Sequence, residues 1–237
     1  MLFFRRSIVR AFRRFVRRAA NRFGYDITRR IAPPPGSVPL RWEDVRRALA
    51  IHRGYALAAD VPGDIVECGV GCGASFTVLA LMAQAEGAGR RVWGFDSFQG
   101  FPEPSAEDAS PRNPRRGELA FGTPDEIARA IVGSGVSERF FAAHCRLVPG
   151  FFDESLSRFT GERIAFLHLD VDLYRSYKTC LTALYPRVAA GGVVLFDEYT
   201  AAVYPGARRA IDEYFGVAVR DLQTDPYLNN RFLVKPR

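Results

Sequence analysis

Residues 65–75 read Ile-Val-Glu-Cys-Gly-Val-Gly-Cys-Gly-Ala-Ser, and this stretch decides the expected fold. It begins as a short strand, and the residues from Ser75 to Ala85 are predicted to form a helix. The glycines between them allow a sharp turn and let a bound molecule approach the backbone closely. Strand, glycine turn and helix in this order are typical of nucleotide-binding α/β folds. By itself, the pattern fits a dinucleotide-binding domain nearly as well as other members of that class.

Strands and helices alternate along most of the chain. Further apolar runs of strand length occupy Val92–Phe95, Ile164–Leu169 and Val193–Phe196. Helical spacing is found at 41–59, Ser75–Ala85, Pro124–Ile131 and Tyr177–Val188. The alternation predicts an α/β fold with a doubly wound, mostly parallel sheet and helices on both faces. Val217–Leu222 and Arg231–Val234 are predicted to form an antiparallel hairpin at one edge, because a turn sequence separates them.

Basic residues are concentrated at the N-terminus. The chain of 237 residues has a net charge of +7, but residues 1–30 contain ten Arg and one Asp. That segment carries +9, which leaves −2 for the remainder. A body with this charge does not favour nucleic acid binding, so we expect a small-molecule partner and no nucleic acid.

The basic segment has the spacing of an amphipathic helix. Apolar residues recur at steps of three and four: Phe4, Ile8, Phe12, Phe15, Ala19 and Phe23. We therefore divide the chain into a basic helical appendage at 1–31, a Pro-rich linker at 32–40 and a folded domain at 41–237. Two roles are open for residues 2–23: packing on the body or on a second subunit of a homo-oligomer, or lying on an anionic membrane surface.

Cysteine usage and hydropathy indicate the compartment. The four cysteines form no Cys-x-x-Cys pair and no disulfide ladder, and the two in the glycine turn are interpreted as packing residues rather than metal ligands. The first thirty residues never run seven apolar residues without an arginine, so we expect no signal peptide and no transmembrane span. A reducing, cytoplasmic setting is expected, with peripheral contact at the inner face of the membrane if the appendage binds lipid.

Acidic residues follow three of the predicted strands. Asp96 ends the second strand, about twenty residues after the glycine turn, where a carboxylate can bind a ribose diol. Asp170 and Asp172 follow a buried strand, and Asp197 and Glu198 follow the next one. Because the carboxyl ends of parallel strands meet at one edge, these four carboxylates are expected to converge, and they would repel unless a cation joined them. Oxygen ligands without a histidine cluster favour Mg2+ or Ca2+ over zinc.

His168 lies two residues before Asp170, so the two side chains share one face of the sheet. We interpret it as a core histidine with satisfied hydrogen bonds, and a supporting role behind the acids is the alternative. Three arginines are interpreted as solvated or paired with neighbouring acids rather than catalytic: Arg175, Arg208 and Arg209.

In combination, these segments resemble the macrocin O-methyltransferase family, the class I methyltransferases that modify deoxysugars on macrolides and related glycosides. The matching stretches are residues 61–70, 94–104, 164–176, 184–186, 191–193, 197–199 and 206–215. They extend over about residues 61–216. The family usually has Asp-Asp where this chain has Asp197-Glu198, a change that keeps the charge and lengthens the reach by one methylene group.

The resemblance implies a Rossmann-like class I methyltransferase fold with a seven-stranded sheet, preceded here by N-terminal helices. It implies Mg2+-dependent transfer of a methyl group from S-adenosylmethionine to a hydroxyl of a sugar or glycoside, in a natural product or a surface glycan. Asp170, Asp197 and Glu198 would hold the metal, and Asp172 would act as the base. The donor would be bound by Glu67, Gly69, Gly71, Gly73, Ser75, Asp96 and Ser97, with Asp96 on the ribose.

Three alternatives belong to other classes. A catechol-type O-methyltransferase would use the same donor and metal on a planar vicinal diol. A NAD-dependent dehydrogenase or epimerase would need a Tyr-x-x-x-Lys pair, and Tyr174 and Lys178 have that spacing directly after an acid pair. A membrane-docked scaffold without activity is disfavoured by the acids at both strand ends.

Overall fold

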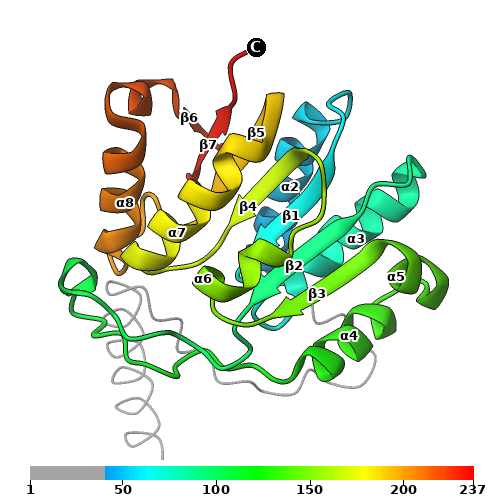
Figure 1. Ribbon diagram of the computed structural model, residues 1–237, viewed down its shortest axis with the longest axis horizontal. Helices are drawn as coiled ribbons and strands as arrows, with labels where there is room; N and C mark the ends of the chain where they lie inside the picture. Colours follow the sequence, from blue (N-terminus) through cyan, green and yellow to red (C-terminus); the bar gives the residue numbers. More distant parts are fainter. Residues whose placement is uncertain (1–40) are drawn as a thin grey trace, which may run out of the picture.

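The computed structural model describes residues 41–237, which fold around one seven-stranded sheet in the order β3-β2-β1-β4-β5-β7-β6 (Figure 1). The strands are β1 (Asp64–Cys68), β2 (Val92–Asp96), β3 (Cys145–Pro149), β4 (Ile164–Leu169), β5 (Val188–Phe196), β6 (Gln223–Thr224) and β7 (Arg231–Val234). β1 to β5 are parallel, and β7 runs antiparallel to both β5 and β6. The predicted α/β fold with an antiparallel edge is confirmed. The expected appendage and linker lie outside the described residues.

Helices cover both faces of this sheet (Figure 1). One face carries α2 (Trp42–Leu57), α3 (Ala74–Glu86), α4 (Pro124–Gly133) and α5 (Glu138–His144). The other carries α6 (Phe152–Ser155), α7 (Tyr174–Leu184) and α8 (Pro205–Phe215). The alternation of side chains along each strand divides the core: Phe166 of β4 packs beneath α2 and α3, whereas Leu167 packs beneath α7 and α8.

Local sequence explains where the helices begin and end. Thr123 caps α4 and accepts a hydrogen bond from the amide of Glu126, whose carboxylate bonds back to the Thr123 amide. α3 ends at Gly87, which adopts a left-handed φ of 70°. Pro186 cannot continue α7, so the chain forms the short 3-10 helix η3 (Tyr185–Arg187) before β5.

The structure corrects two predicted elements and adds a strand that was not predicted. The predicted strand at Val217–Leu222 is wrong: η4 (Gly216–Asp221) is a 3-10 helix there, and only Gln223 and Thr224 pair with β7. Val217 is exposed over 84% of its surface, so this apolar run has no sheet face to cover. The helix predicted at Tyr177–Val188 begins at Tyr174 and ends at Leu184. β3 was not predicted, because its edge position leaves Arg146 exposed and breaks the apolar pattern.

The chain order creates a crevice at the carboxyl edge of the sheet. From β1 the chain moves outward to β2 and β3, and it returns to the other side of β1 with β4 and β5. This reversal leaves a switch point between β1 and β4, where ligands bind in open α/β sheets. The segment 97–123, which includes the short helix η1 (Ala106–Asp108), crosses the same edge. Among residues 41–237, no helix combines the length and apolar character needed to cross a membrane.

Candidate active site

A cavity of about 830 Å3 occupies the carboxyl edge of the sheet. The glycine turn after β1 lines one part of it, and Asp170 and Asp172 after β4 line another. Its wall is completed by Arg47 of α2 and by segment 97–123. The cavity therefore joins the predicted donor site to two of the four predicted acids, whereas Asp197 and Glu198 do not line it.

The glycine turn needs glycine for two reasons. Gly69, Gly71 and Gly73 have φ values of 88°, 54° and 86°, which side chains rarely tolerate. In addition, a Cβ at Gly69 would lie 1.7 Å from the carbonyl oxygen of Asp170. The backbone of the glycine turn therefore contacts the backbone of Asp170 directly. The donor half of the cavity and its acidic half meet at this contact.

Asp96 connects the glycine turn to the loop after β2. Its Oδ2 accepts a hydrogen bond from the amide of Gly71 at 2.9 Å, and its Oδ1 accepts one from the amide of Phe98 at 2.7 Å. The neighbouring Ser97 hydroxyl donates to the carbonyl of Gly100 at 2.7 Å. Asp96 and Ser97 both line the cavity, so the carboxylate is held rigidly at its wall.

The structure brings most of the predicted donor-site residues together. Those that line the cavity are Gly69, Gly71, Ser75, Asp96 and Ser97. Two do not line it. Gly73 is the N-cap of α3, and Glu67 is completely buried in β1.

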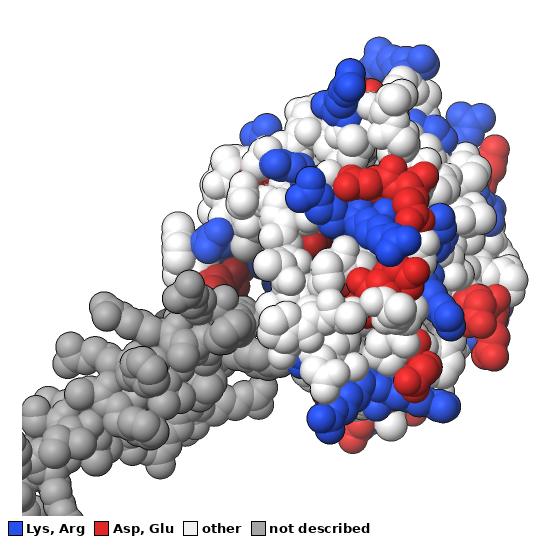
Figure 2. Space-filling view, turned by 90° about the vertical axis from the view of Figure 1, so that its left-hand side faces the viewer, with Lys and Arg blue, Asp and Glu red and all other residues white. Residues whose placement is uncertain are grey.

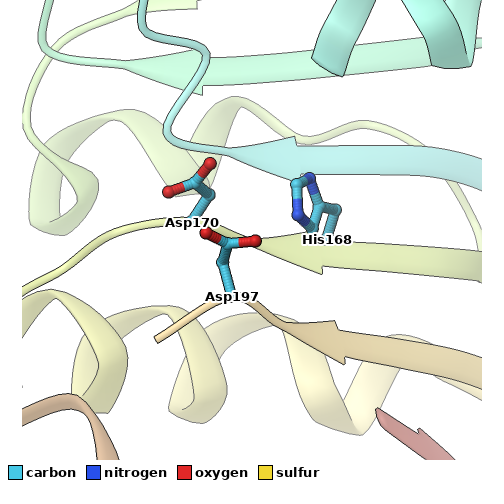
Figure 3. A group of neighbouring side chains, drawn as sticks. All are labelled: His168, Asp170 and Asp197. Atoms are coloured by element: carbon cyan, nitrogen blue, oxygen red, sulfur yellow. The ribbon is translucent and has the colours of Figure 1, made fainter. Parts of the chain in front are cut away.

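The predicted metal ligands fall into two overlapping groups. Possible ligand atoms of His168, Asp170 and Asp197 lie within 4.8 Å of one another (Figure 3). Those of Asp170, Asp172 and Glu198 meet the same limit. Asp170 belongs to both groups, whereas the consecutive residues Asp197 and Glu198 belong to different ones.

Burial and mutual repulsion disfavour the ionised forms of this cluster. Burial, followed by the charge of Asp170, raises the pKa of both Asp197 and Glu198. Burial together with Asp170 and Asp197 also raises the pKa of Asp172. Closely spaced buried carboxylates of this kind need a positive charge to remain ionised together.

Arg47 supplies one such charge, and the sequence did not indicate it. Its Nη1 lies 3.0 Å from Asp170 Oδ2 and 3.5 Å from Asp197 Oδ2. The other oxygen of Asp197 accepts a hydrogen bond from the Asn230 side-chain amide at 2.8 Å. Arg47 comes from α2 and Asn230 from the loop before β7, so no local pattern links either residue to the acids.

Asp172 lies on the other side of Asp170 in a strained backbone conformation, with φ of 59°. Its amide donates to Glu198 Oε2 at 3.3 Å. Tyr204 is its neighbour: burial, and then the charge of Asp172, raises the pKa of the Tyr204 phenol. The guanidinium of Arg112 lies 5.0 Å above the Tyr204 ring. Positive φ at a non-glycine residue is typical of functional positions, where the fold holds a strained conformation in place.

Tyr177 of α7 holds the Glu198 side chain in place. The Tyr177 hydroxyl lies 2.6 Å from Glu198 Oε2 and 2.9 Å from the carbonyl of Leu169. A phenol has a single proton to donate. Without a bound metal, both contacts are satisfied when Tyr177 donates to Leu169 and a protonated Glu198 donates to Tyr177, in agreement with the raised pKa of Glu198.

The remaining predicted residues lie outside the cavity or at its margin. Tyr174 and Lys178 both contact Glu213 of α8, at 2.6 and 3.3 Å, so they do not form a proton-transfer pair in the cavity. Arg208 and Arg209 pair with acids one helical turn away, as predicted. On the side of the molecule that carries α8, basic and acidic side chains lie next to one another (Figure 2). Arg175 is exposed, as predicted, and it also lines the cavity.

Of the two cysteines in the glycine turn, Cys68 packs in the core as predicted, whereas the prediction is wrong for Cys72, which is exposed and lines the cavity. All four are free thiols, and three of them are buried. Packing therefore explains Cys68, Cys145 and Cys180.

Strand order, glycine turn and strand-end acids together define the fold of a class I methyltransferase, and solved structures of that class superimpose on it. A sequence profile of the macrocin-O-methyltransferase (TylF) family matches residues 44–225, and the chain belongs to this family. The calicheamicin methyltransferase CalS11 aligns with a TM-score of 0.72 and 26% identity, over 86% of this chain and 87% of that protein.

Two curated relatives are similar in sequence. The first is the 8-demethyl-8-(2,3-dimethoxy-alpha-L-rhamnosyl)-tetracenomycin-C 4'-O-methyltransferase of Streptomyces olivaceus, 37% identical over 68% of this chain and 60% of the relative. The second is the demethyldecarbamoylnovobiocin O-methyltransferase of Streptomyces niveus, 33% identical over 73% of this chain and 64% of the relative. The chain thus spans less than two thirds of the length of either relative.

Proposed function

We propose that this protein transfers a methyl group from S-adenosylmethionine to a hydroxyl of a sugar or glycoside, with Mg2+ as a cofactor. One observation carries the proposal: a single cavity joins the glycine turn and Asp96 to the acids that follow β4, in a chain of the macrocin-O-methyltransferase family. The relatives support the acceptor class, since one is named for a rhamnosyl compound. A further CalS11 structure, of which 88% is covered at 25% identity with a TM-score of 0.67, is described as a TDP-rhamnose 3'-O-methyltransferase.

The donor half of the cavity suits a nucleoside. Gly69 and Gly71 expose backbone without side chains, and Asp96 presents a carboxylate that is already oriented by two amides. A carboxylate at the end of the second strand can accept hydrogen bonds from both ribose hydroxyls. Ser75 and Ser97 contribute polar groups to the same wall. Glu67 in β1 and Gly73 at the start of α3 do not line the cavity, and they would support the donor site indirectly.

The acidic half suits a divalent cation. Asp170, Asp197 and Glu198 are proposed to hold it, with Asp170 as the acid common to the two groups of possible ligands. Burial and the charge of Asp170 raise the pKa of Asp197 and of Glu198, so a bound cation would favour their ionised forms. A bound divalent metal would acidify and position the acceptor hydroxyl. Asp172 faces the same cavity without the Arg47 contact and would accept the hydroxyl proton. In the transfer, the acceptor oxygen forms a bond to the methyl carbon, the sulfur–methyl bond breaks, and S-adenosylhomocysteine leaves.

The test is direct. The purified protein is incubated with S-adenosylmethionine, Mg2+ and a panel of sugar nucleotides and glycosides that includes dTDP-rhamnose, and products are followed by mass spectrometry. We expect S-adenosylhomocysteine and a methylated sugar in equal amounts. Catechol in the same panel tests the planar-diol alternative. Failure to bind S-adenosylhomocysteine in calorimetry would refute the methyltransferase proposal.

We propose two alternative roles for the N-terminal segment, and one experiment distinguishes them. Residues 2–23 are proposed either to contact an anionic membrane surface or to join subunits of a homo-oligomer. A chain beginning at Ser37 is compared with the full chain for sedimentation with phosphatidylserine vesicles and for mass in solution. Loss of vesicle binding supports membrane contact. Loss of the oligomer, with no vesicle binding in either chain, supports assembly.

A further inference from the structure

A buried glutamate and a buried histidine pair directly behind the acid cluster. Glu67 of β1 and His168 of β4 are register partners in the parallel ladder. His168 Nδ1 lies 2.8 Å from Glu67 Oε1, and the two side chains are 1% and 0% exposed. The histidine was predicted to have all its hydrogen bonds satisfied, and this is wrong. Its Nε2 has no hydrogen-bond partner among the described residues.

The unpartnered nitrogen faces the acids. Because Nδ1 is directed to Glu67, Nε2 is on the opposite side of the ring, and Figure 3 shows one ring nitrogen turned toward the carboxylates of Asp170 and Asp197. A nitrogen of His168 and an oxygen of each acid lie within 4.8 Å of one another. This limit is slightly more than twice a metal–ligand bond length of about 2.0–2.2 Å, so binding three donor atoms to one ion would need only a small inward movement of the side chains.

The chemistry of this arrangement calls for a cation. A glutamate that accepts the Nδ1 proton leaves Nε2 as a lone pair, and a lone pair beside two carboxylates is unfavourable in a buried site. The same carboxylate–histidine contact is how proteins orient histidine ligands toward metals. Arg47 shares its single positive charge between Asp170 and Asp197 but provides no partner for Nε2. Its side chain is 39% exposed and lines the cavity.

We propose that His168 Nε2 is a direct ligand of the divalent metal held by Asp170 and Asp197, and that Glu67 orients the imidazole. The inference rests on the metal-dependent part of the proposed function. It changes the expected metal preference, because one nitrogen among oxygen ligands favours Mn2+ or Co2+ over Mg2+. It also gives Glu67, which does not line the cavity, a role as a positioning residue for the metal site.

The decisive measurement is pulsed electron paramagnetic resonance of Mn2+ bound to the full-length protein. We expect modulation from a directly bound 14N nucleus, and we expect it to change to the 15N pattern when the protein is labelled with 15N-histidine. This labelling requires no substitution, so the result does not depend on a variant that folds. The chain has only three histidines, which keeps the assignment simple.

Substitutions then identify the histidine. His168→Gln should abolish the nitrogen coupling and weaken Mn2+ binding by about 10-fold or more, with a smaller effect on Mg2+. His52→Gln, at an exposed position of α2, is the matched control and should retain the coupling. Glu67→Gln should weaken Mn2+ binding by about 10- to 100-fold, the usual effect of removing a carboxylate that supports a histidine ligand.

Two outcomes overturn the proposal and are distinguishable. Bound Mn2+ without nitrogen coupling in the unsubstituted protein would exclude His168 as a ligand and leave the metal-dependent function standing. If calorimetry detects no Mn2+ binding, both the His168 proposal and the metal-dependent function are overturned.

Discussion

Asp96 is the residue whose removal should most clearly weaken donor binding. Its carboxylate accepts the amides of Gly71 and Phe98 and lines the cavity at the position proposed for the ribose. Asp96→Ala would remove the acceptor for two ribose hydroxyls and would also release the amide of Gly71. Both effects weaken binding of the donor or its product.

The magnitude follows from charge-assisted hydrogen bonding. Loss of a carboxylate that holds two hydroxyls costs about 2–3 kcal/mol of binding free energy. At about 1.4 kcal/mol for each factor of ten, this corresponds to a 30- to 150-fold weaker affinity. Asp96→Asn retains one oxygen acceptor but loses the charge, so its affinity should fall between those of the Ala variant and the unsubstituted protein.

Titration calorimetry with S-adenosylhomocysteine measures the effect, and thermal melting checks that each variant is folded. Asp60→Ala, at an exposed position beyond the end of α2, is the control and should bind normally. If Asp96→Ala binds as tightly as the unsubstituted protein, Asp96 does not belong to the donor site and the assignment of the cavity halves is wrong.

Three further predictions concern the acids, the glycine turn and pH. Asp172→Asn should lower turnover about 100-fold or more with donor binding intact and no rescue by added Mg2+, whereas Asp170→Ala should be partly rescued; rescue of Asp172→Asn would identify Asp172 as a ligand instead. Gly69→Ala should lower the free energy of unfolding by at least about 3 kcal/mol and the melting temperature by roughly 6–12 °C, because its Cβ would overlap the Asp170 carbonyl. Gly87→Ala, which has a similar φ but no atom within 4 Å, should cost only about 1–2 kcal/mol, and equal losses would contradict the steric argument. In metal-free protein, the raised pKa values of Asp172, Asp197 and Glu198 mean that the folded state binds protons more tightly than the unfolded state. Stability should therefore fall as pH rises above about 4 and through the folded pKa values, by up to about 1.4 kcal/mol per pH unit for each titrating group. Melting curves between pH 5 and 8 should show this decline without metal and a weaker one with Mn2+, and a rise in stability over that range would refute it.

Local sequence patterns predicted the parts of the site that a single segment builds. The glycine turn could be predicted because three left-handed positions, Gly69, Gly71 and Gly73, fall within five residues and require glycine. The acids after β2, β4 and β5 could be predicted to lie together because parallel strands bring their carboxyl ends to one edge of the sheet. The mostly parallel sheet could be predicted because strands and helices alternate along the chain. The edge strands β3 and β6 were not predicted, since edge strands need no continuous apolar face.

Contacts between distant segments decided the rest. Arg47 and Asn230 reach Asp197 from opposite ends of the described chain, and Tyr204 reaches Asp172 from the loop before α8. The sequence alone placed the predicted acids at one edge and identified His168 as buried. Only the tertiary structure placed Asp197 and Glu198 in different groups of possible metal ligands. It also showed that His168 pairs with Glu67. The physical reason is that a side chain's type and face follow from its own strand, whereas its partners depend on which strand and helix the fold places beside it.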